Sequence, residues 1–167
     1  YNCLQTYNPG SNEDGYNTGV GINVLSGTTT GNNNTAVGGK AMEDNTTGDY
    51  NTAVGAFALD ANTTANANTA VGYYALATNT TSANNTCIGE SSGYKQTGNG
   101  NTGIGYRSMG YHNTATGQRN TALGMEAMRS HTGGDYNVTA GYQSGFYLTT
   151  ADECVLIGSQ AGVNITT

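Results

Sequence analysis

The chain of 167 residues contains little of what an ordinary globular core is built from. It has no Trp, two Phe and one Pro, and charged residues make up 10 % of it, against about a quarter in typical domains. Much of the 35 % apolar fraction is Ala and Tyr, so few large aliphatic side chains remain for a compact core. The composition therefore does not suit an ordinary globular domain.

Basic residues and long apolar runs are also scarce. The five Lys and Arg residues are scattered along a chain whose net charge is −6. Nucleic-acid binding is not expected, because it needs a basic face. No run of about 18 apolar residues is present, so we expect no insertion into a membrane.

Sequence motifs for catalysis and metal binding are missing as well. No Ser/His/Asp set and no Gly-x-Ser-x-Gly elbow occurs, and the calcium-binding nonapeptide pattern is absent. His112 and His131 have no Cys or Asp partner at metal-ligand spacing, and we predict that both lie on the surface. We therefore expect no enzyme activity, no cofactor and no metal.

The sequence does contain a block that returns about every 17 residues, a period typical of a stacked-repeat structure. The block Asn-Thr-Ala-Val-Gly occurs at Asn34, Asn51 and Asn68. Its strict register argues against disorder, although the composition is polar. With the first residue of the block as position 0, the turns begin at Asn17, Asn34, Asn51, Asn68, Asn85, Asn101, Asn120, Asn137 and Cys154.

Two positions of the repeat are occupied by one kind of residue in every turn. Position 4 is always Gly, which suits a coil that needs positive φ or close backbone approach at the same corner of each turn. Position 3 is always apolar, and we predict that it forms the core. The Gly residues are Gly21, Gly38, Gly55, Gly72, Gly89, Gly105, Gly124, Gly141 and Gly158. The predicted core residues are Val20, Val37, Val54, Val71, Ile88, Ile104, Leu123 and Ile157, with Ala140 in the remaining turn.

The repeat predicts an all-β fold, a parallel β-solenoid or β-roll of about nine 17-residue turns. Helical repeats usually need about 33 residues or more, and β-branched residues with a Gly in each unit also oppose a helix. Each turn then has a short strand at positions 1 to 3, a Gly corner, a second short segment and an Asn/Thr corner. Residues 1–16 are the expected N-terminal lead-in or cap, and residues 17–167 the solenoid.

The predicted interior of one such coil is thin. One aliphatic residue per turn contributes about 1.5–3 kcal/mol on burial, which falls short of the entropy cost of ordering the backbone. We therefore predict self-association, most simply three chains in which positions 3 and 8 face a shared axis. A lone solenoid is the competing interpretation, and end-to-end filaments are a further form of self-association.

The motif Asn68-Thr-Ala-Val-Gly-Tyr-Tyr-Ala-Leu76, followed by Asn79-Thr-Thr81, resembles repeats of two families. One is the head of trimeric autotransporter adhesins, which implies a left-handed parallel β-roll in a homotrimer. The other, which is more similar, is the group of bacteriophage tail fibres and related surface proteins. The resemblance extends from Asn17 to about Gly162. The adhesin-head repeat is typically shorter than the repeat of this chain, so its geometry does not transfer in detail.

The turn from Asn101 to Arg119 is longer than the other turns. It contains Tyr106, Arg107 and Tyr111, a combination that suits contact with a glycan; the alternative is a tolerated surface insertion. We also expect exposed tyrosines at positions 5 and 6, which either stack on sugar rings or cover neighbouring turns. These are Tyr73, Tyr74, Tyr106 and Tyr142.

Cysteines and Asn-x-Ser/Thr sequons add two further hypotheses. Cys87 and Cys154 lie four turns apart, too far for a disulfide within one chain. Cys3 and Cys154 would meet if rods stack end to end, so an intermolecular bridge is a hypothesis, with idle thiols as the alternative. Sequons at Asn45, Asn62 and Asn79 recur at one position of successive turns and either carry glycans or form Asn-rich corners.

These features favour a non-enzymatic structural or adhesive fibre segment: a phage tail fibre, or a subunit of a microbial surface filament or adhesin. The expected location is extracellular, on a cell surface or virion. The expected partners are further copies of the chain and a host-surface glycan. Two alternatives are a tailspike-like protein that binds or hydrolyses glycans, and an ice-binding solenoid. The Thr residues at position 1 suggest the latter: Thr18, Thr35, Thr52, Thr69, Thr86, Thr102 and Thr121.

Overall fold

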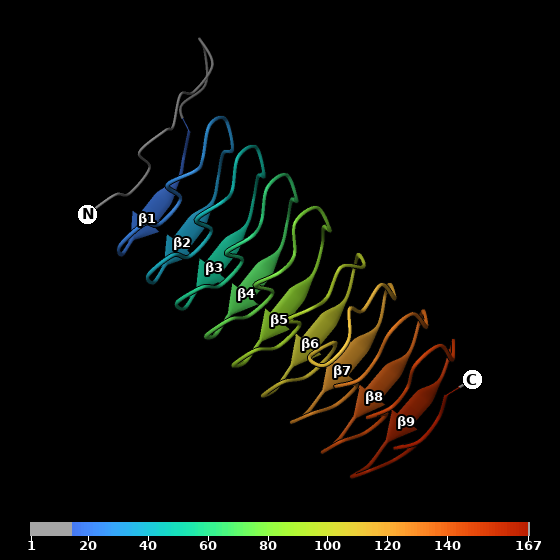
Figure 1. Ribbon diagram of the computed structural model, residues 1–167. Helices are drawn as coiled ribbons and strands as arrows, with labels where there is room; N and C mark the ends of the chain where they lie inside the picture. Colours follow the sequence, from blue (N-terminus) through green and yellow to red (C-terminus); the bar gives the residue numbers. More distant parts are fainter. Residues whose placement is uncertain (1–14, 167) are drawn as a thin grey trace.

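The computed structural model describes residues 15–166, and this part of the chain is one parallel β-solenoid (Figure 1). Nine strands form a single sheet in sequence order, so eight complete turns lie between the first strand and the last. This confirms the predicted fold class and repeat length; most of the predicted lead-in, 1–16, lies outside the described residues. The strands are β1 Thr18–Val20, β2 Thr35–Val37, β3 Thr52–Val54, β4 Thr69–Val71, β5 Thr86–Ile88, β6 Thr102–Ile104, β7 Thr121–Leu123, β8 Val138–Ala140 and β9 Val155–Ile157.

Each strand pairs with the equivalent residues one turn away. Between β2 and β3, for example, Thr35 lies beside Thr52 and Val37 beside Val54. The strands are therefore arranged as a ladder whose rungs are about 4.8 Å apart, and like residues form columns along the coil. No helix long and apolar enough to cross a membrane occurs among residues 15–166.

The Gly residues at position 4 are required for two reasons at once in every turn but the last, where Gly158 has positive φ but no atom within 4 Å of a Cβ. Their φ angles lie between +124° and +142°, a region that side chains of L-residues rarely adopt. A Cβ atom on Gly55 would also lie 2.5 Å from the carbonyl oxygen of Gly72 in the next turn. Positive φ and close backbone approach, the two reasons inferred from the repeat, thus coincide at this corner.

The interior of the coil differs from the predicted core. Position 3 faces outward: Val54, Ile88, Ile104 and Leu123 are 37–40 % exposed. Side chains alternate along a strand, so position 2 points inward, where it meets positions 7 and 8. The fully buried side chains include Ala36, Ala53, Ala70, Cys87, Ala122, Ala41, Ala58, Ala75, Leu25, Met42, Leu59, Leu76, Met109 and Met128.

This burial also shows that the predicted trimer axis is wrong for position 8, one of the two positions expected to face it. The side chains at position 8, such as Leu59, lie inside the single coil and therefore cannot face an axis shared with other chains. The side chains at position 3 lie on the outer face of the sheet, where they are partly exposed. The thin interior is filled because each Leu or Met at position 8 packs beside the small residue at position 2.

Positions 2 and 8 compensate each other in volume. Where position 8 is Leu or Met, position 2 is Ala or Gly, as in the pair Ala53 and Leu59. Where position 8 is Gly, position 2 is larger: Cys87 with Gly93, Thr139 with Gly145, and Leu156 with Gly162. A Cβ atom on Gly93 would lie 2.5 Å from the Cys87 sulfur, so the inward volume is occupied by one position or the other.

Buried Asn side chains at position 0 join the turns. The Oδ1 atom of each accepts a hydrogen bond from the backbone N–H at position 0 of the following turn, at 2.8–3.0 Å. The amide nitrogen donates within the coil, as from Asn51 to the Ala65 carbonyl at 2.8 Å. An amide supplies both a donor and an acceptor, which explains why Asn begins eight of the nine turns.

Three further places in each turn have left-handed backbone without being reserved for Gly. At position 6, φ lies between 51° and 61°, in residues that include Lys40 and Arg107. At position 8, φ lies between 49° and 63°, whether the residue is Leu59 or Gly93. The residue just before each turn from Asn34 to Cys154 has φ between 54° and 70°, as at Arg119. All three places therefore accept side chains of several kinds in the same backbone conformation.

Candidate functional site

An uninterrupted line of aromatic and cationic side chains runs along one edge of the coil. It begins where Lys40 Nζ lies 5.9 Å from the ring centre of Phe57. Phe57 stacks on Tyr74, with ring centres 4.8 Å apart and planes inclined by 15°. Tyr74 contacts Tyr94 at 5.8 Å. We call the whole line the aromatic ridge: Lys40, Phe57, Tyr74, Tyr94, Arg107, Tyr111, Arg129 and Phe146.

The ridge continues through the expanded turn to the segment that follows β8. The rings of Tyr94 and Tyr111 lie 6.0 Å apart. Arg129 Cζ lies 5.2 Å from the Tyr111 ring and 5.5 Å from the Phe146 ring. The ridge thus takes at least one residue from each of seven successive turns and is about 29 Å long at about 4.8 Å per turn.

The repeat explains how these side chains come together. Lys40, Phe57, Tyr74 and Arg107 occupy position 6, whereas Tyr94, Arg129 and Phe146 occupy position 9. Positions 6 and 9 face each other across the edge, as the ion pairs Lys40–Glu43 at 2.8 Å and Glu126–Arg129 at 2.9 Å show. A ridge residue can therefore come from either position without a break in the line.

The three residues predicted to contact a glycan lie together on this ridge. The Arg107 guanidinium carbon lies 4.8 Å from the Tyr106 ring and 4.4 Å from the Tyr111 ring, so the guanidinium contacts both rings. Among residues 15–166, Arg107 has no carboxylate partner within ion-pair distance. Tyr106 is exposed and Tyr111 half-buried, which leaves the group at the surface.

The expansion of this turn lies in the segment 111–114. Gln96 forms a bridge with Ala115, and the Lys95 N–H donates to the Gly110 carbonyl. Two adjacent residues of the preceding turn therefore face two residues that are separated by Tyr111, His112, Asn113 and Thr114. This bulge brings an aromatic ring and an imidazole to the ridge.

Positive charge gathers at this bulge, although the chain as a whole is acidic. Loss of solvent, followed by the nearby charges of Arg129, Lys95 and Arg107, lowers the pKa of His112 below its ordinary value. Lys95 Nζ also donates to the His112 carbonyl at 3.0 Å. Three of the five basic residues of the chain therefore surround one imidazole, with Glu126 as the opposing acid.

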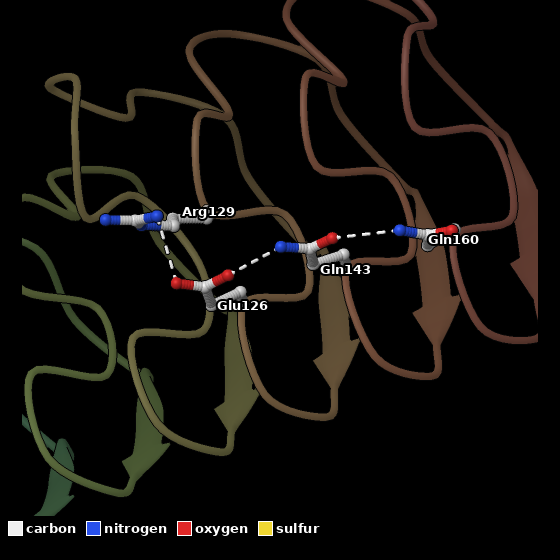
Figure 2. A network of polar contacts seen from close by, with 4 residues as sticks. All are labelled: Glu126, Arg129, Gln143 and Gln160. Carbon is white, nitrogen blue, oxygen red and sulfur yellow. Dashed lines mark hydrogen bonds and ion pairs between the residues drawn. The ribbon is translucent and has the colours of Figure 1, made fainter.

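Beyond the bulge, the edge becomes a polar ladder. Figure 2 shows Glu126, Gln143 and Gln160 in a row across successive turns, with Arg129 directed away from that row. Glu126 accepts hydrogen bonds from Arg129 at 2.9 Å and from Gln143 at 2.8 Å, and Gln160 donates to Gln143 at 3.3 Å. Glu126 therefore holds the Arg129 guanidinium beside Tyr111 and Phe146.

The tyrosines expected on the outer face do not all have the same environment. Tyr73, Tyr106 and Tyr142 are exposed, whereas Tyr74 is half-buried between Phe57 and Tyr94. Tyr74 thus covers neighbouring turns, which was one of the two roles considered for these residues. The remaining three are exposed at the surface.

The outer face of the sheet carries two columns. Thr residues at position 1, such as Thr35 and Thr52, stand beside the aliphatic residues at position 3, such as Val37 and Val54, because positions 1 and 3 point the same way. No charged residue occurs at either position from β1 to β9. This face is therefore regular, uncharged and partly apolar.

The proposed glycosylation sites are wrong for a physical reason. Asn45, Asn62 and Asn79 are fully buried. Asn62 Nδ2 donates to Asn45 Oδ1 at 2.7 Å, and Asn79 Nδ2 donates to the Ser82 carbonyl at 2.8 Å. These amides link the turns from within, so an attached sugar would have no room.

The expected surface location is wrong for one of the two histidines. His131 occupies the same position 11 as the buried Asn residues and is itself fully buried. Its Nδ1 lies 3.0 Å from the Leu148 carbonyl oxygen, and its Nε2 lies 3.3 Å from Asn120 Nδ2. A neutral ring with the proton on Nδ1 satisfies both contacts; His112, by contrast, is exposed.

The cysteines give no disulfide in the described residues. Cys87 is fully buried and Cys154 is half-buried, and both are free thiols. Burial raises the pKa of Cys87 to about 12, which keeps this thiol protonated. Cys3 lies outside the described residues, so the intermolecular Cys3–Cys154 bridge stays a prediction.

Sequence reasoning misses most of the ridge. It does not single out Tyr94, Arg129 or Phe146 on the ridge, or Lys95 beside it, although the first three share position 9. The repeat register does place these residues at a common position. The ridge can be recognised from it only if one knows that positions 6 and 9 face each other. Among residues 15–166, no group of three or more His, Cys, Asp or Glu residues is placed to hold a metal ion.

Comparisons with family models, with curated proteins and with solved structures find no match to this chain. The resemblance to tail-fibre and adhesin-head repeats therefore rests on the repeat motif itself. What the structure adds to it is the parallel β-solenoid, with one strand in each turn.

Proposed function

We propose that this chain is a segment of a non-enzymatic, adhesive fibre, in which the β-solenoid is the rigid scaffold and the aromatic ridge contacts glycans. The observation that carries the proposal is the continuity of the ridge. Neighbouring ring centres lie 4.8–6.0 Å apart from Phe57 to Tyr111. Lys40 at one end and Arg129 with Phe146 at the other continue the line through cation–ring contacts of 5.2–5.9 Å. Such an edge can contact several units of an extended polymer at once.

The chemistry of the ridge supports sugar as the ligand. Aromatic rings offer flat apolar faces and edges to the C–H groups of sugars, while the Tyr hydroxyls add hydrogen bonds. Tyr73 and Tyr106 are exposed at or beside the ridge. The proposed role as a tail fibre or surface adhesin, and an extracellular location, follow from this chemistry together with the repeat motif.

Self-association completes the proposal. The outward aliphatic residues at position 3 form a column along the whole sheet, and burying it between chains would supply the stabilisation that one thin coil lacks. A homotrimer around this face leaves the ridge, which lies at another edge of the turn, free for a ligand. End-to-end association into filaments would lengthen the same scaffold.

Four measurements test the fibre proposal. Electron microscopy and mass in solution should give rods or filaments, with a rod mass of three times 17.1 kDa. Immobilised polysaccharides should retain the protein, and no reducing sugar should be released from them. A strict monomer that binds no polysaccharide contradicts the proposal, whereas released sugar would favour the tailspike-like alternative.

The outer face of the sheet favours ice binding as a second candidate function. The Thr and aliphatic columns form an uncharged two-column array on the sheet, which is the kind of face an ice-binding solenoid uses. This role requires the face to be free, so it is incompatible with the proposed trimer. Thermal hysteresis of a monomeric protein would support ice binding, and its absence would remove this candidate.

A further inference from the structure

We infer that the bulge of the expanded turn binds an acidic sugar unit of an extended polysaccharide, with the Arg107 guanidinium taking the carboxylate between Tyr106 and Tyr111. This inference rests on the proposed glycan-binding function and names its ligand class. It concerns the segment 111–114 and the side chains that surround it in the preceding and following turns.

Arg107 is held by aromatic rings and has no carboxylate beside it. Its guanidinium is fixed by two tyrosine rings, at 4.8 and 4.4 Å, and among the described residues it meets no carboxylate within ion-pair distance. Stacking on rings uses the faces of a guanidinium and leaves its in-plane N–H groups free to donate. The Nε–H of Arg107 is buried without a hydrogen-bond partner, so the two terminal Nη groups are the ones available to a ligand. A pre-oriented fork of this kind matches the two oxygens of a carboxylate.

The other two arginines differ from Arg107 in their contacts. Arg129 is paired with Glu126 at 2.9 Å, and Arg119 donates to the Tyr136 hydroxyl at 3.0 Å. Each of these guanidinium groups therefore has a polar partner, whereas Arg107 has two ring partners. Among the described arginines, Arg107 is the one whose guanidinium contacts rings without an ion pair or a hydroxyl partner.

Positive charge is in local excess around the bulge. Arg107, Arg129 and Lys95 all act on His112, and Glu126 is the acid that opposes them there. In a chain of net charge −6, three of the five basic residues are grouped here, and such a group attracts an anion. A neutral sugar would gain nothing from this arrangement.

The flanking rings argue for a sugar over other anions. Tyr106 is exposed beside the guanidinium, and Tyr94 and Tyr111 continue the ridge at 6.0 Å. A uronic acid places its carboxylate on a ring whose C–H faces can pack on these tyrosines, and the adjacent units of the polymer can follow the ridge. A simple acidic peptide would use the charge but not the rings.

The test uses hexagalacturonate and its fully methyl-esterified form, which share one backbone and differ in charge. We expect the full chain to bind the acid at least about tenfold more tightly than the ester, as a charged hydrogen-bonded pair contributes. Arg107→Gln should abolish this difference, and Arg107→Lys should keep only part of it because Lys has no planar fork. Calorimetric titration of each variant measures the dissociation constants.

The variants are chosen so that the fold is preserved. Gln occupies position 6 at Gln143 and Gln160 with φ of 53° and 58°, and Lys occupies it at Lys40 with φ of 61°. The matched control is Arg119→Asn, which removes one charge just before a new turn, where Asn33 and Asn84 already have φ of 57° and 62°. It should change the affinity for the acid by no more than about twofold through long-range charge.

Each other outcome decides against a particular part of the inference. Equal binding of the acid and the ester leaves glycan adhesion intact and overturns the acidic class. Equal losses in the Arg107 and Arg119 variants show unspecific attraction and overturn the site. Hexaglutamate that binds as tightly as hexagalacturonate overturns the sugar. No binding of either saccharide to the wild-type chain overturns this inference, and the fibre proposal is then decided by its own polysaccharide retention test.

Discussion

At the scale of single residues, the Gly at position 4 is the most constrained part of each turn. Gly55 combines a φ of +135° with a neighbouring carbonyl oxygen 2.5 Å from where a Cβ would lie. Gly55→Ala should therefore lower the free energy of unfolding by at least about 2 kcal/mol, through backbone strain and overlap. Urea unfolding followed by circular dichroism measures the change.

Gly39 provides the matched control for that substitution. It is the next residue after a position 4 Gly, and a Cβ on it would have nothing within 4 Å. Gly39→Ala should leave stability unchanged or raise it by up to about 1 kcal/mol, because Ala restricts the unfolded chain. Equal destabilisation by the two substitutions would contradict the account of this corner.

His131 should make the stability of the coil depend on pH. Burial lowers the pKa of His131 below its ordinary value of 6.5, so the unfolded state binds the proton more readily. The stabilisation is complete above about pH 6.5 and is lost as the pH falls toward the folded-state pKa, with a slope of up to about 1.4 kcal/mol per pH unit. Unfolding free energies measured between pH 8 and pH 5 test this.

The repeat supplies the control variant for His131. Asn stands at the same position in Asn45, Asn62 and Asn79, where it is buried and hydrogen-bonded. His131→Asn should fold and should remove most of the pH slope between pH 6.5 and 5, while His112 remains in both proteins. A slope that persists unchanged in the variant would assign the effect to other groups.

At the scale of the turn, the inward volume is shared by positions 2 and 8. Gly93→Leu alone should destabilise the protein by about 1–3 kcal/mol, because the new side chain overlaps the Cys87 sulfur. Combined with Cys87→Ala, the same substitution recreates the Ala/Leu pair of Ala53 and Leu59 and should recover most of the loss. Denaturant unfolding of the wild type, both single variants and the double variant forms a complete cycle.

The cycle also has a clear negative result. Contacting residues should show a coupling energy of at least about 1 kcal/mol in the favourable direction. Additive effects would mean that the introduced leucine and the Cys87 side chain do not compete for the same volume. The Cys87→Ala variant by itself should lose only a small amount, since it removes one buried sulfur without creating a clash.

The register of the turns was predictable from the sequence, whereas the direction of the side chains was not fully predicted. Thr at position 1 and Gly at position 4 placed the strands and the corner correctly. Val37 was expected in the interior because it is more apolar than Ala36, but the available space is set by Met42 and leaves room only for Ala. The alternation of side chains along a strand was the signal that could have settled this.

The candidate site was predicted in part. Tyr106, Arg107 and Tyr111 could be found from the expanded turn, because an irregular unit with aromatic and basic residues is conspicuous in a regular repeat. Tyr94 and Arg129 could not, since their contacts depend on which positions of neighbouring turns face each other. The burial of Asn62 and His131 could not be predicted for a different reason. Polar residues at a corner usually face solvent, so both were expected at the surface.

At the scale of the whole molecule, the outward position 3 column sets the prediction for assembly. A trimer formed through this face should dissociate when a charge is introduced into it, because a buried, unpaired carboxylate is costly. Ile88→Asp should therefore convert a particle of three chains into monomers, as measured by light scattering. Tyr142→Asp, on an exposed residue outside the sheet, is the control and should leave the mass unchanged.

The ladder of strands has a mechanical consequence. The hydrogen bonds between turns point along the coil, so a pull on the two ends would load one rung at a time instead of all rungs together. Each turn that yields would release about 17 residues and lengthen the chain from about 4.8 Å to about 58 Å when fully extended. A fibre built this way would extend in equal steps under tension. These steps would limit the force on a ligand bound along the aromatic ridge.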